Sequence, residues 1–380
     1  MDSASRVRRG RVGRVVTVFL CGDVMPARGI DQILPHPGDP ALREPCVDDA
    51  RTYVGLAESV NGRIPRPVDF AWPWGDSLQL LDDVAPDVRI VNLETSITRS
   101  AEFAPNKGVH YRMSPDNVAC LAVLRPSACA LANNHVLDFG RAGLVDTLDA
   151  LSRAGLVAVG AGRDARGAQQ PAVIPLASGG RVLVLACGLG SSGIPQSWAA
   201  AADRPGVYFL PALTDKVATD LTDQVSLMRR TGDVVVVSIH WGSNWGYDVH
   251  PDQRRFAHRL IDGGVDIVHG HSSHHPRPIE TYRGKLVLYG CGDFVNDYEG
   301  ISGHAEFRDD LRLMYFASVH QDTGELAELR MAVMHARRLR LEHASRADSE
   351  WLHAALGRVS DHFGTHIELL DDGRLALRAE

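Results

Sequence analysis

The sequence predicts an α/β fold in which helices cover buried β-sheets. Short runs of β-branched and aliphatic residues recur along the 380-residue chain, and amphipathic helical patterns lie between them. Uninterrupted apolar runs of this length are typical of strands buried on both faces, and their alternation with helices indicates sheets covered by helices. The composition, 44% hydrophobic and 23% charged, is that of a globular protein and excludes a disordered chain.

Predicted strands and helices alternate up to about residue 290. Strands are predicted at residues 15–21, 88–92, 128–132, 182–187, 234–239, 266–270 and 286–290. Helices are predicted at residues 115–124, 142–153, 214–230 and 252–263. The first of these helices opens with Ser-Pro-Asp, which favours helix initiation. Segment 35–75 is rich in proline and tryptophan, and we expect it to form an irregular excursion over the core.

The two ends of the chain differ in character from this central part. Residues 1–14 are predicted to be a basic disordered tail, because five arginines precede an apolar run of only seven residues without a signal-peptide cleavage site. Residues 15–305 are expected to form the core. Residues 306–380 are expected to pack on it, with strands of an outer sheet at 313–319 and 326–341 and a helix at 349–363.

Composition and charge exclude several classes of protein. No stretch of about 18 uncharged apolar residues exists, so we expect no direct membrane insertion. The net charge of −7, with mixed signs, argues against a nucleic-acid partner. The six cysteines form no C-x-x-C pair and lie in apolar segments, which suits buried thiols in a reducing cytoplasm. We therefore expect a cytoplasmic protein.

Acids, amides and imidazoles follow the predicted strands where the apolar runs stop. They are Asp23, Asn92, Glu94, Asn133, Asn134, His135, His240, His269, His271, His274, His275 and Asp293. Each one alone would be interpreted as a helix cap, a turn residue or a packed ring. Because ligand sites in open α/β sheets lie outside the carboxyl ends of the strands, we expect these groups to converge on one rim.

This convergence predicts a metal site. Carboxylates and imidazoles buried together would be costly without a cation, since like charges repel and unpaired polar groups lose their hydration. Mixed carboxylate, amide and imidazole ligands suit two adjacent divalent ions, with Mn, Fe, Zn or Ca as the candidates.

The ordered motifs resemble those of the CapA family of poly-γ-glutamate (capsule) synthesis proteins. Strand-Gly-Asp is followed by Asn-Leu-Glu, Asn-Asn-His, His-Trp-Gly, Gly-His-x-x-His and Gly-Asp-Phe, from about residue 17 to about residue 300. That family resembles the calcineurin-like metallophosphoesterases in fold and metal-site layout. The resemblance implies a four-layer α-β-β-α sandwich with a metal centre at the strand ends.

The resemblance also implies a role for each motif residue. Asp23 would bind the first metal, Glu94 would stand where the superfamily uses a bridging aspartate, and Asn134 would be the amide ligand. His135 would be a proton donor. His240 would bind the second metal, and His271 and His274 would close the site.

The sequence departs from the superfamily pattern at two points. The first motif is usually Asp-x-His, but Met25 stands here in place of the histidine. The last motif is usually Gly-His-x-His, but His274 falls one residue later than that spacing requires. Both departures imply a coordination shell that differs from that of an ordinary phosphoesterase.

Three further residues have two open interpretations each. His304, on a glycine-flanked loop, could reach the metal rim as an acid or base, or belong to a surface loop. Arg112 could hold a substrate carboxylate or phosphate by a bidentate contact, or have a surface role. Trp241, with Trp245 and Tyr247, could wall a substrate pocket or pack in the core.

Three functions remain open from the sequence. The first is a metal-dependent hydrolase-like enzyme acting on poly-γ-glutamate or a related peptide or phosphoester substrate. The second, implied by resemblance to peptide epimerases, is inversion of an α-carbon in a ribosomally made, lasso-type precursor peptide by Asp23 and His304. The third is a non-catalytic scaffold of a capsule-synthesis complex.

Overall fold

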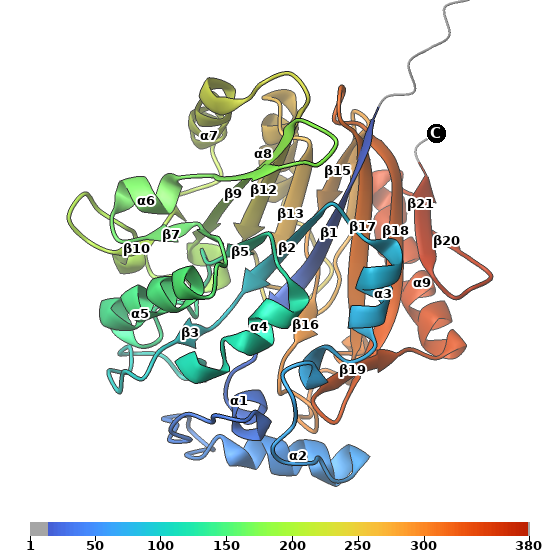
Figure 1. Ribbon diagram of the computed structural model, residues 1–380. Helices are drawn as coiled ribbons and strands as arrows, with labels where there is room; N and C mark the ends of the chain where they lie inside the picture. The colour runs from blue at the N-terminus through green and yellow to red at the C-terminus, as the bar shows by residue number, and fades with distance from the viewer. Residues whose placement is uncertain (1–13, 379–380) are drawn as a thin grey trace, which may run out of the picture.

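Two β-sheets stack face to face, and helices cover their outer faces (Figure 1). The computed structural model describes residues 14–378. In this range the first sheet has ten strands, in the spatial order β20 (Glu368–Leu369), β21 (Leu375–Arg378), β18 (Leu326–Arg337), β17 (Leu311–His320), β1 (Val15–Val24), β2 (Val88–Leu93), β5 (Ala128–Ala130) and β6 (Ala158–Val159), with β16 (Asp293–Val295) beside β1 and β19 (Arg340–His343) beside β18.

The second sheet has seven strands in the described residues. Their order is β11 (Phe209–Leu210), β9 (Arg181–Leu189), β12 (Asp233–His240), β13 (Ile267–His271), β15 (Lys285–Leu288) and β14 (Ile279–Tyr282), with β8 (Ala172–Pro175) beside β9. Two short pairs lie outside the sheets, β3 (Ser96–Ile97) with β4 (Arg112–Met113) and β7 (Ala161–Gly162) with β10 (Gly206–Val207).

The helices are placed between these strands along the chain. They are α1 (Gly29–Ile33), α2 (Arg51–Asn61), α3 (Ser77–Val84), α4 (Ala119–Leu124), α5 (Gly140–Arg153), α6 (Ala165–Gln169), α7 (Asp215–Met228), α8 (Pro251–Asp262) and α9 (Arg346–Ser360). Residues of α2 to α5 pack on the outer face of the first sheet, and residues of α7 and α8 pack on the outer face of the second.

Alternation of side chains along the strands explains the layers. In β1, Val16, Val18 and Leu20 pack between the two sheets, whereas Phe19 and Cys21 pack on the helix side. The same alternation holds along β9 and β12 of the second sheet. Both faces of these three strands are therefore buried along most of their length, which is why the sequence shows uninterrupted apolar runs there. The predicted α/β class and four-layer α-β-β-α order are confirmed.

Segment 35–75 differs from its prediction as an irregular excursion. It contains α2, which buries Tyr53, Val54 and Ala57 on one face. This one-sided burial is that of an ordinary amphipathic helix. The prolines and tryptophans on either side of α2 obscured its pattern in the sequence.

The C-terminal strands also differ in placement from the predicted outer sheet. β17 pairs antiparallel with β1, from Val15 opposite His320 to Leu20 opposite Tyr315, and therefore belongs to the first sheet. The predicted strand at 326–341 is divided into β18 and β19 by Arg338 and Leu339, which have φ angles of 55° and 54°. The predicted tail, residues 1–14, lies outside the described residues except for Arg14.

Candidate metal centre

Asp23 lies at the centre of the polar rim, at the end of β1. Its side chain is fully buried, and its Oδ1 accepts a hydrogen bond of 2.7 Å from Asn92 Nδ2. Its Oδ2 is buried and has no hydrogen-bond partner among residues 14–378. Burial, followed by the charges of Glu94 and Asp293, raises the pKa of Asp23 well above its usual value. A buried carboxylate oxygen without a partner is costly, so this position favours a cation.

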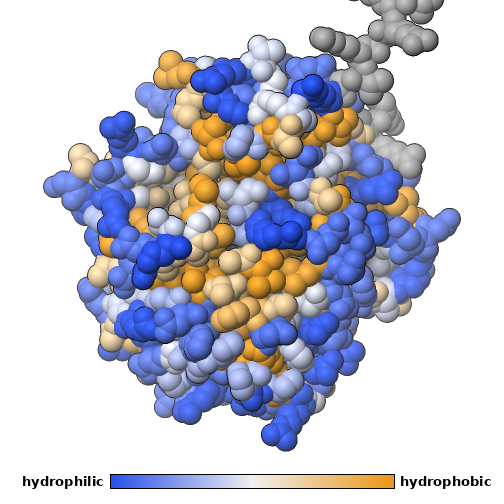
Figure 2. Space-filling model, in the orientation of Figure 1, coloured by the Kyte–Doolittle hydropathy of each residue, from blue (hydrophilic) through white to orange (hydrophobic). Residues whose placement is uncertain are grey.

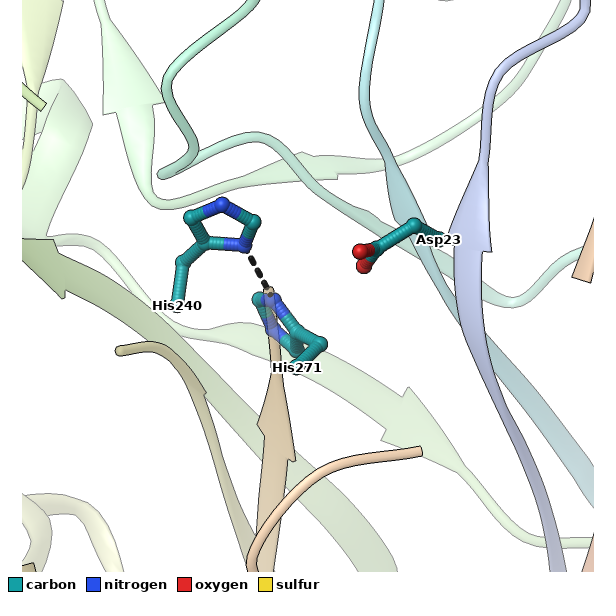
Figure 3. A group of neighbouring side chains, drawn as sticks. All are labelled: Asp23, His240 and His271. Carbon is teal, nitrogen blue, oxygen red and sulfur yellow. Dashed lines mark hydrogen bonds between the residues drawn. The ribbon is translucent and has the colours of Figure 1, made fainter. Parts of the chain in front are cut away.

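His240 and His271 face Asp23 from the second sheet. They end the neighbouring parallel strands β12 and β13, where they are register partners, and their Nδ1 atoms lie 2.8 Å apart. Figure 3 shows both rings turned towards the Asp23 carboxylate, and one ligand atom from each of the three residues lies within 4.8 Å of the others. Burial and the neighbouring imidazoles lower the pKa of both histidines well below the usual value. Both rings are therefore neutral, the form that binds metals.

A second group shares Asp23 and adds His274 and Asp293. One ligand atom from each of these three buried residues also lies within 4.8 Å of the others. His274 Nδ1 donates to Asp293 Oδ1 at 2.9 Å. Although burial lowers it, the pKa of His274 is raised, because the Asp293 charge outweighs burial. Asp23 is thus common to two potential metal-binding groups, a place that the sequence interpretation gave to Glu94.

Glu94 and Asn134 lie beside the first group. Glu94 Oε1 is 3.8 Å from His240 Nε2, and Asn134 Oδ1 is 2.9 Å from the same nitrogen. Burial, followed by the Asp293 charge, raises the pKa of Glu94 to about 8. The side chain of Asn133 accepts from the backbone N–H groups of His135 and Val136. These two hydrogen bonds fix the turn in which the Asn134 side chain faces His240.

The donor set fits divalent cations. The structure brings together the six residues that the sequence predicted as ligands, namely Asp23, Glu94, Asn134, His240, His271 and His274. Three carboxylates, those of Asp23, Glu94 and Asp293, are buried together, and besides burial the charges of Glu94 and Asp293 raise the pKa of Asp23. A cation would relieve this repulsion and pair with the orphaned oxygen of Asp23. Which of these residues bind metal stays a prediction.

His135 lies at the edge of the centre, in a hydrogen-bonded group with Asp138. His135 Nδ1 is 2.6 Å from Asp138 Oδ2, and Lys107 Nζ contacts both residues. Burial lowers the pKa of His135 to about 4, so the ring is neutral at pH 7. Its Nε2 lies 3.9 Å from Glu94 Oε1. The Asp138 bond orients the ring so that Nε2 faces the centre.

A cavity of about 220 Å³ opens beside these groups. Its lining consists of Glu94, Lys107, Val109, Tyr111, Asn134, His135, Asn244, Ser272, His274 and Tyr298. Sequence reasoning missed Lys107, because it lies in a loop far from any strand end. The only signal for it is a lone cation in a neutral stretch, which is common in surface loops.

Trp241 and Arg112, which the sequence analysis considered as substrate-binding residues, do not face the cavity. Trp241 is 1% exposed, and its Nε1 donates to the backbone oxygen of Tyr289, so it packs in the core and does not wall a pocket. Arg112 is 8% exposed and donates to the backbone oxygens of Ser100 and Asp39, which leaves no free bidentate face for a substrate anion.

His304 packs against Trp245 and is not among the side chains of either ligand group. Its ring stacks on Trp245 with centroids 3.7 Å apart, and the Trp245 ring lies 5.3 Å from that of His274. Within the described residues, His304 therefore has an aromatic contact with Trp245 and shares no ligand group with Asp23, its proposed partner. Its predicted role as an acid or base stays a prediction.

The fold and site define a calcineurin-like α/β protein with a candidate metal centre at the strand ends. A family model described as "Bacterial capsule synthesis protein PGA_cap" matches residues 17–298. This match covers most of the chain. The protein therefore belongs to the PGA_cap family of bacterial capsule synthesis proteins, to which the CapA proteins belong.

Named relatives agree with this family. The chain is 55% identical over 363 residues, 95% of each chain, to a "Probable polyglutamine synthesis accessory protein" of Mycobacterium tuberculosis. It is 30% identical over 233 residues to the "PGA biosynthesis protein CapA" of Bacillus subtilis, covering 61% of this chain and 58% of that one. It is 25% identical over 292 residues to the "Capsule biosynthesis protein CapA" of Bacillus anthracis, covering 76% and 61%.

The surface of the described residues is mixed in polarity. Figure 2 shows hydrophilic residues around the edge of one face and apolar residues towards its middle. The exposed large apolar side chains belong to separate parts of the fold, and they are Val15, Val60, Val157, Val173, Leu227 and Ile301. Among the helices in residues 14–378, none has the length and apolar character needed to cross a membrane.

Proposed function

We propose that this protein is a metal-dependent enzyme that acts on poly-γ-glutamate or a related peptide-like substrate. The observation that carries the proposal is the position of Asp23, whose buried carboxylate is shared by two groups of ligand side chains. Divalent ions held by Asp23, Glu94, Asn134, His240, His271 and His274 would supply Lewis acidity towards a carbonyl or phosphoryl oxygen. Membership of a capsule-synthesis family supports the substrate class.

The residues of the chain itself supply proton transfer and charge. Asp138 accepts the Nδ1 proton of His135, which leaves His135 Nε2 free to exchange a proton with a substrate in the cavity. Lys107 lines the same cavity and carries a positive charge. A cation at this position favours substrates with carboxylate groups, as in a polymer of glutamate.

The two alternatives have weaker support. Inversion of an α-carbon by Asp23 and His304 requires two groups on opposite sides of the substrate, but His304 stacks on Trp245 and belongs to neither ligand group. A purely structural scaffold has no use for three carboxylates buried side by side, because their repulsion lowers stability. A metal-dependent hydrolase-like enzyme does not require His304 at the centre, and bound cations would account for the buried carboxylates.

The proposal is tested by elemental analysis of metals in the purified protein. We expect divalent metal in the wild-type chain and loss of it in the Asp23→Ala, His271→Ala double variant. A His258→Ala variant is the matched control, since His258 pairs with Glu280 on another part of the fold. Equal metal content in the wild type and the double variant would reject the centre.

The reaction is tested by incubation with poly-γ-glutamate. We expect the polymer to shorten with the metal-loaded wild type and to stay intact after chelation. Entry of solvent deuterium into an α-carbon of a peptide, without cleavage, would instead support epimerisation.

A further inference from the structure

Met25 stands where the superfamily pattern has a histidine that binds metal. Its side chain is fully buried and packs with Ala27 and Tyr111 in a small apolar cluster. A thioether in an apolar cluster is a poor ligand for hard divalent ions. The imidazole that the superfamily pattern has at this position therefore needs a replacement from elsewhere in the chain.

Asp293 lies where such a replacement would be needed. It begins β16, which runs parallel to β1, and its register partner is Asp23. Register partners in a parallel pair direct their side chains to the same face of the sheet. The Asp293 carboxylate accordingly lies with Asp23 and His274 in the second ligand group, and it is 1% exposed.

A second layer of hydrogen bonds holds Asp293 in place. Asn296 Nδ2 donates to Asp293 Oδ2 at 2.6 Å, and Asn296 Oδ1 accepts from Arg312 at 2.9 Å. The Arg312 guanidinium is buried, and its acceptors within the described part of the chain are neutral, namely the backbone oxygens of Asp309 and Leu311 and the side-chain oxygen of Asn296. Groups that orient a ligand from behind in this way are typical of metal sites.

We propose that Asp293 is a metal ligand that replaces the missing imidazole and makes the two halves of the centre chemically unequal. This inference rests on the proposed metal-dependent function. One half has two imidazoles and one carboxylate, from His240, His271 and Asp23. The other half has one imidazole and two carboxylates, from His274, Asp23 and Asp293.

Ligand hardness assigns different ions to the two halves. Imidazole-rich sites suit Zn²⁺, whereas carboxylate-rich sites suit Mn²⁺, Mg²⁺ and Ca²⁺. The carboxylate-rich half still includes His274, and among the hard ions Mn²⁺ is the one that most readily accepts an imidazole. The protein therefore takes Zn²⁺ next to His240 and His271 and Mn²⁺ next to Asp293.

The test offers metal-free protein an equimolar mixture of Zn²⁺ and Mn²⁺, followed by desalting and elemental analysis. We expect the wild type to keep both ions in equal amounts. Asp293→Ala should keep Zn²⁺ and lose Mn²⁺ by about tenfold or more, and His271→Ala should do the reverse. Unchanged Mn²⁺ in Asp293→Ala, or two equivalents of a single ion in the wild type, would overturn the assignment.

Controls separate ligand loss from other effects. Asp309→Asn removes a half-buried carboxylate in the adjoining cavity of about 230 Å³ and should leave both ions unchanged. Asp293→Asn keeps the side-chain volume, so loss of Mn²⁺ there excludes a packing defect, and circular dichroism checks that each variant is folded. A folded wild type that keeps neither ion overturns the metal centre itself, which distinguishes failure of the proposed function from failure of the Asp293 assignment.

Discussion

At the scale of single residues, Asp138 organises the groups beside the candidate centre. Its carboxylate is fully buried and accepts from His135 Nδ1, from Lys107 and from the backbone N–H of Tyr111. Although burial raises it, the pKa of Asp138 is lowered, because the adjacent His135 and Lys107 outweigh burial. Asp138 therefore stays ionised and keeps the Nδ1 proton on His135.

Replacing Asp138 by Asn tests the role of His135. An amide can donate to Nδ1 and so reverse the tautomer, which in comparable hydrogen-bonded pairs lowers turnover by about 10⁴-fold. We expect a large loss of turnover on poly-γ-glutamate with unchanged metal content. Asp146→Asn is the control, because Asp146 is exposed and accepts a hydrogen bond from Thr98 Oγ1, away from His135. Turnover that survives in Asp138→Asn would show that His135 does not transfer the proton.

The Asp23 carboxylate should lower the stability of the metal-free protein while it contributes to metal binding. Asp23→Asn removes one of three mutually repelling carboxylates, so in a chelator it should raise the free energy of unfolding by about 0.5–2 kcal/mol. Metal at about 100 times its Kd should stabilise the wild type by about 2.7 kcal/mol and the variant by less. Urea unfolding with and without metal measures both effects. A variant that is less stable in chelator would mean that repulsion is not the dominant effect.

At the scale of elements, the close approach of β1 to the segment before β16 fixes the position of the Asp23 backbone. Asp23 N–H donates to Gly292 O at 2.9 Å, and a Cβ added at Gly22 would lie 1.6 Å from that same oxygen. A side chain at Gly22 therefore cannot fit without separating the two segments. The glycine is required by this close approach.

Gly22→Ala should consequently affect both folding and the centre. We expect destabilisation of about 1–3 kcal/mol or more, together with weaker metal binding, because Asp23 moves with its neighbour. Gly55→Ala is the matched control, since nothing lies within 4 Å of a Cβ there and it sits within α2. That change should stabilise by about 0.5–1 kcal/mol. Equal stability of the two variants would contradict the close approach.

A cluster of ion pairs connects β17, β18 and α9. Arg308 pairs with Asp310 and Asp348, and His335 Nε2 lies 3.1 Å from Asp310. Although burial raises it, the pKa of Asp310 is lowered strongly, because hydrogen bonds from Arg308 and His335 outweigh burial. The ionised carboxylate is therefore favoured in the folded state.

This shift predicts a pH-dependent contribution to stability. Because the folded pKa of Asp310 is depressed, its stabilisation is fully present above the unfolded value of about 3.9, declines below it, and is lost only as pH falls through the folded pKa. Asp310→Asn should be less stable than wild type by about 0.2–1 kcal/mol at pH 7, and the difference should shrink at pH 3. Urea unfolding at both pH values measures it, and a difference that is unchanged at pH 3 would contradict the ion-pair origin.

At the scale of the whole molecule, the C-terminal strands complete the first sheet. β17 lies next to β1, and β18 lies next to β17, so β1 without them would present an open edge. Tyr315, Leu329 and Met331 also belong to the apolar layer between the sheets. Residues 306–380 thus complete the same core that residues 15–305 begin.

A truncated chain of residues 1–305 tests this dependence. We expect it to aggregate or to lack a cooperative unfolding transition, because the exposed edge and apolar layer are unprotected. The full chain should unfold in one transition by calorimetry. A soluble fragment that unfolds cooperatively would show that residues 15–305 fold on their own.

The α/β class and the convergence of the candidate ligands followed from the sequence because both depend on strand ends, whereas metal binding by those residues stays a prediction. Buried strands leave apolar runs, and polar residues after them must meet at one rim, so Asp23, His240 and His271 could be predicted together. Lys107 and the packed position of Trp241 could not, since loop paths and side-chain partners depend on the completed fold. The resemblance implied the bridging position for Glu94, whereas the residue common to the two ligand groups is Asp23. The sequence does not show this, because the register that places Asp293 beside Asp23 is set by tertiary packing.

The candidate centre draws its ligands from both sheets, with Asp23 from the first and His240 and His271 from the second. The layer between the sheets is apolar and close-packed, and apolar contacts have no directional preference. An ion coordinated by residues of both sheets would therefore fix the position of one sheet relative to the other. Metal binding and sheet alignment would then be thermodynamically coupled, so that a change which displaces one sheet relative to the other would also weaken metal binding.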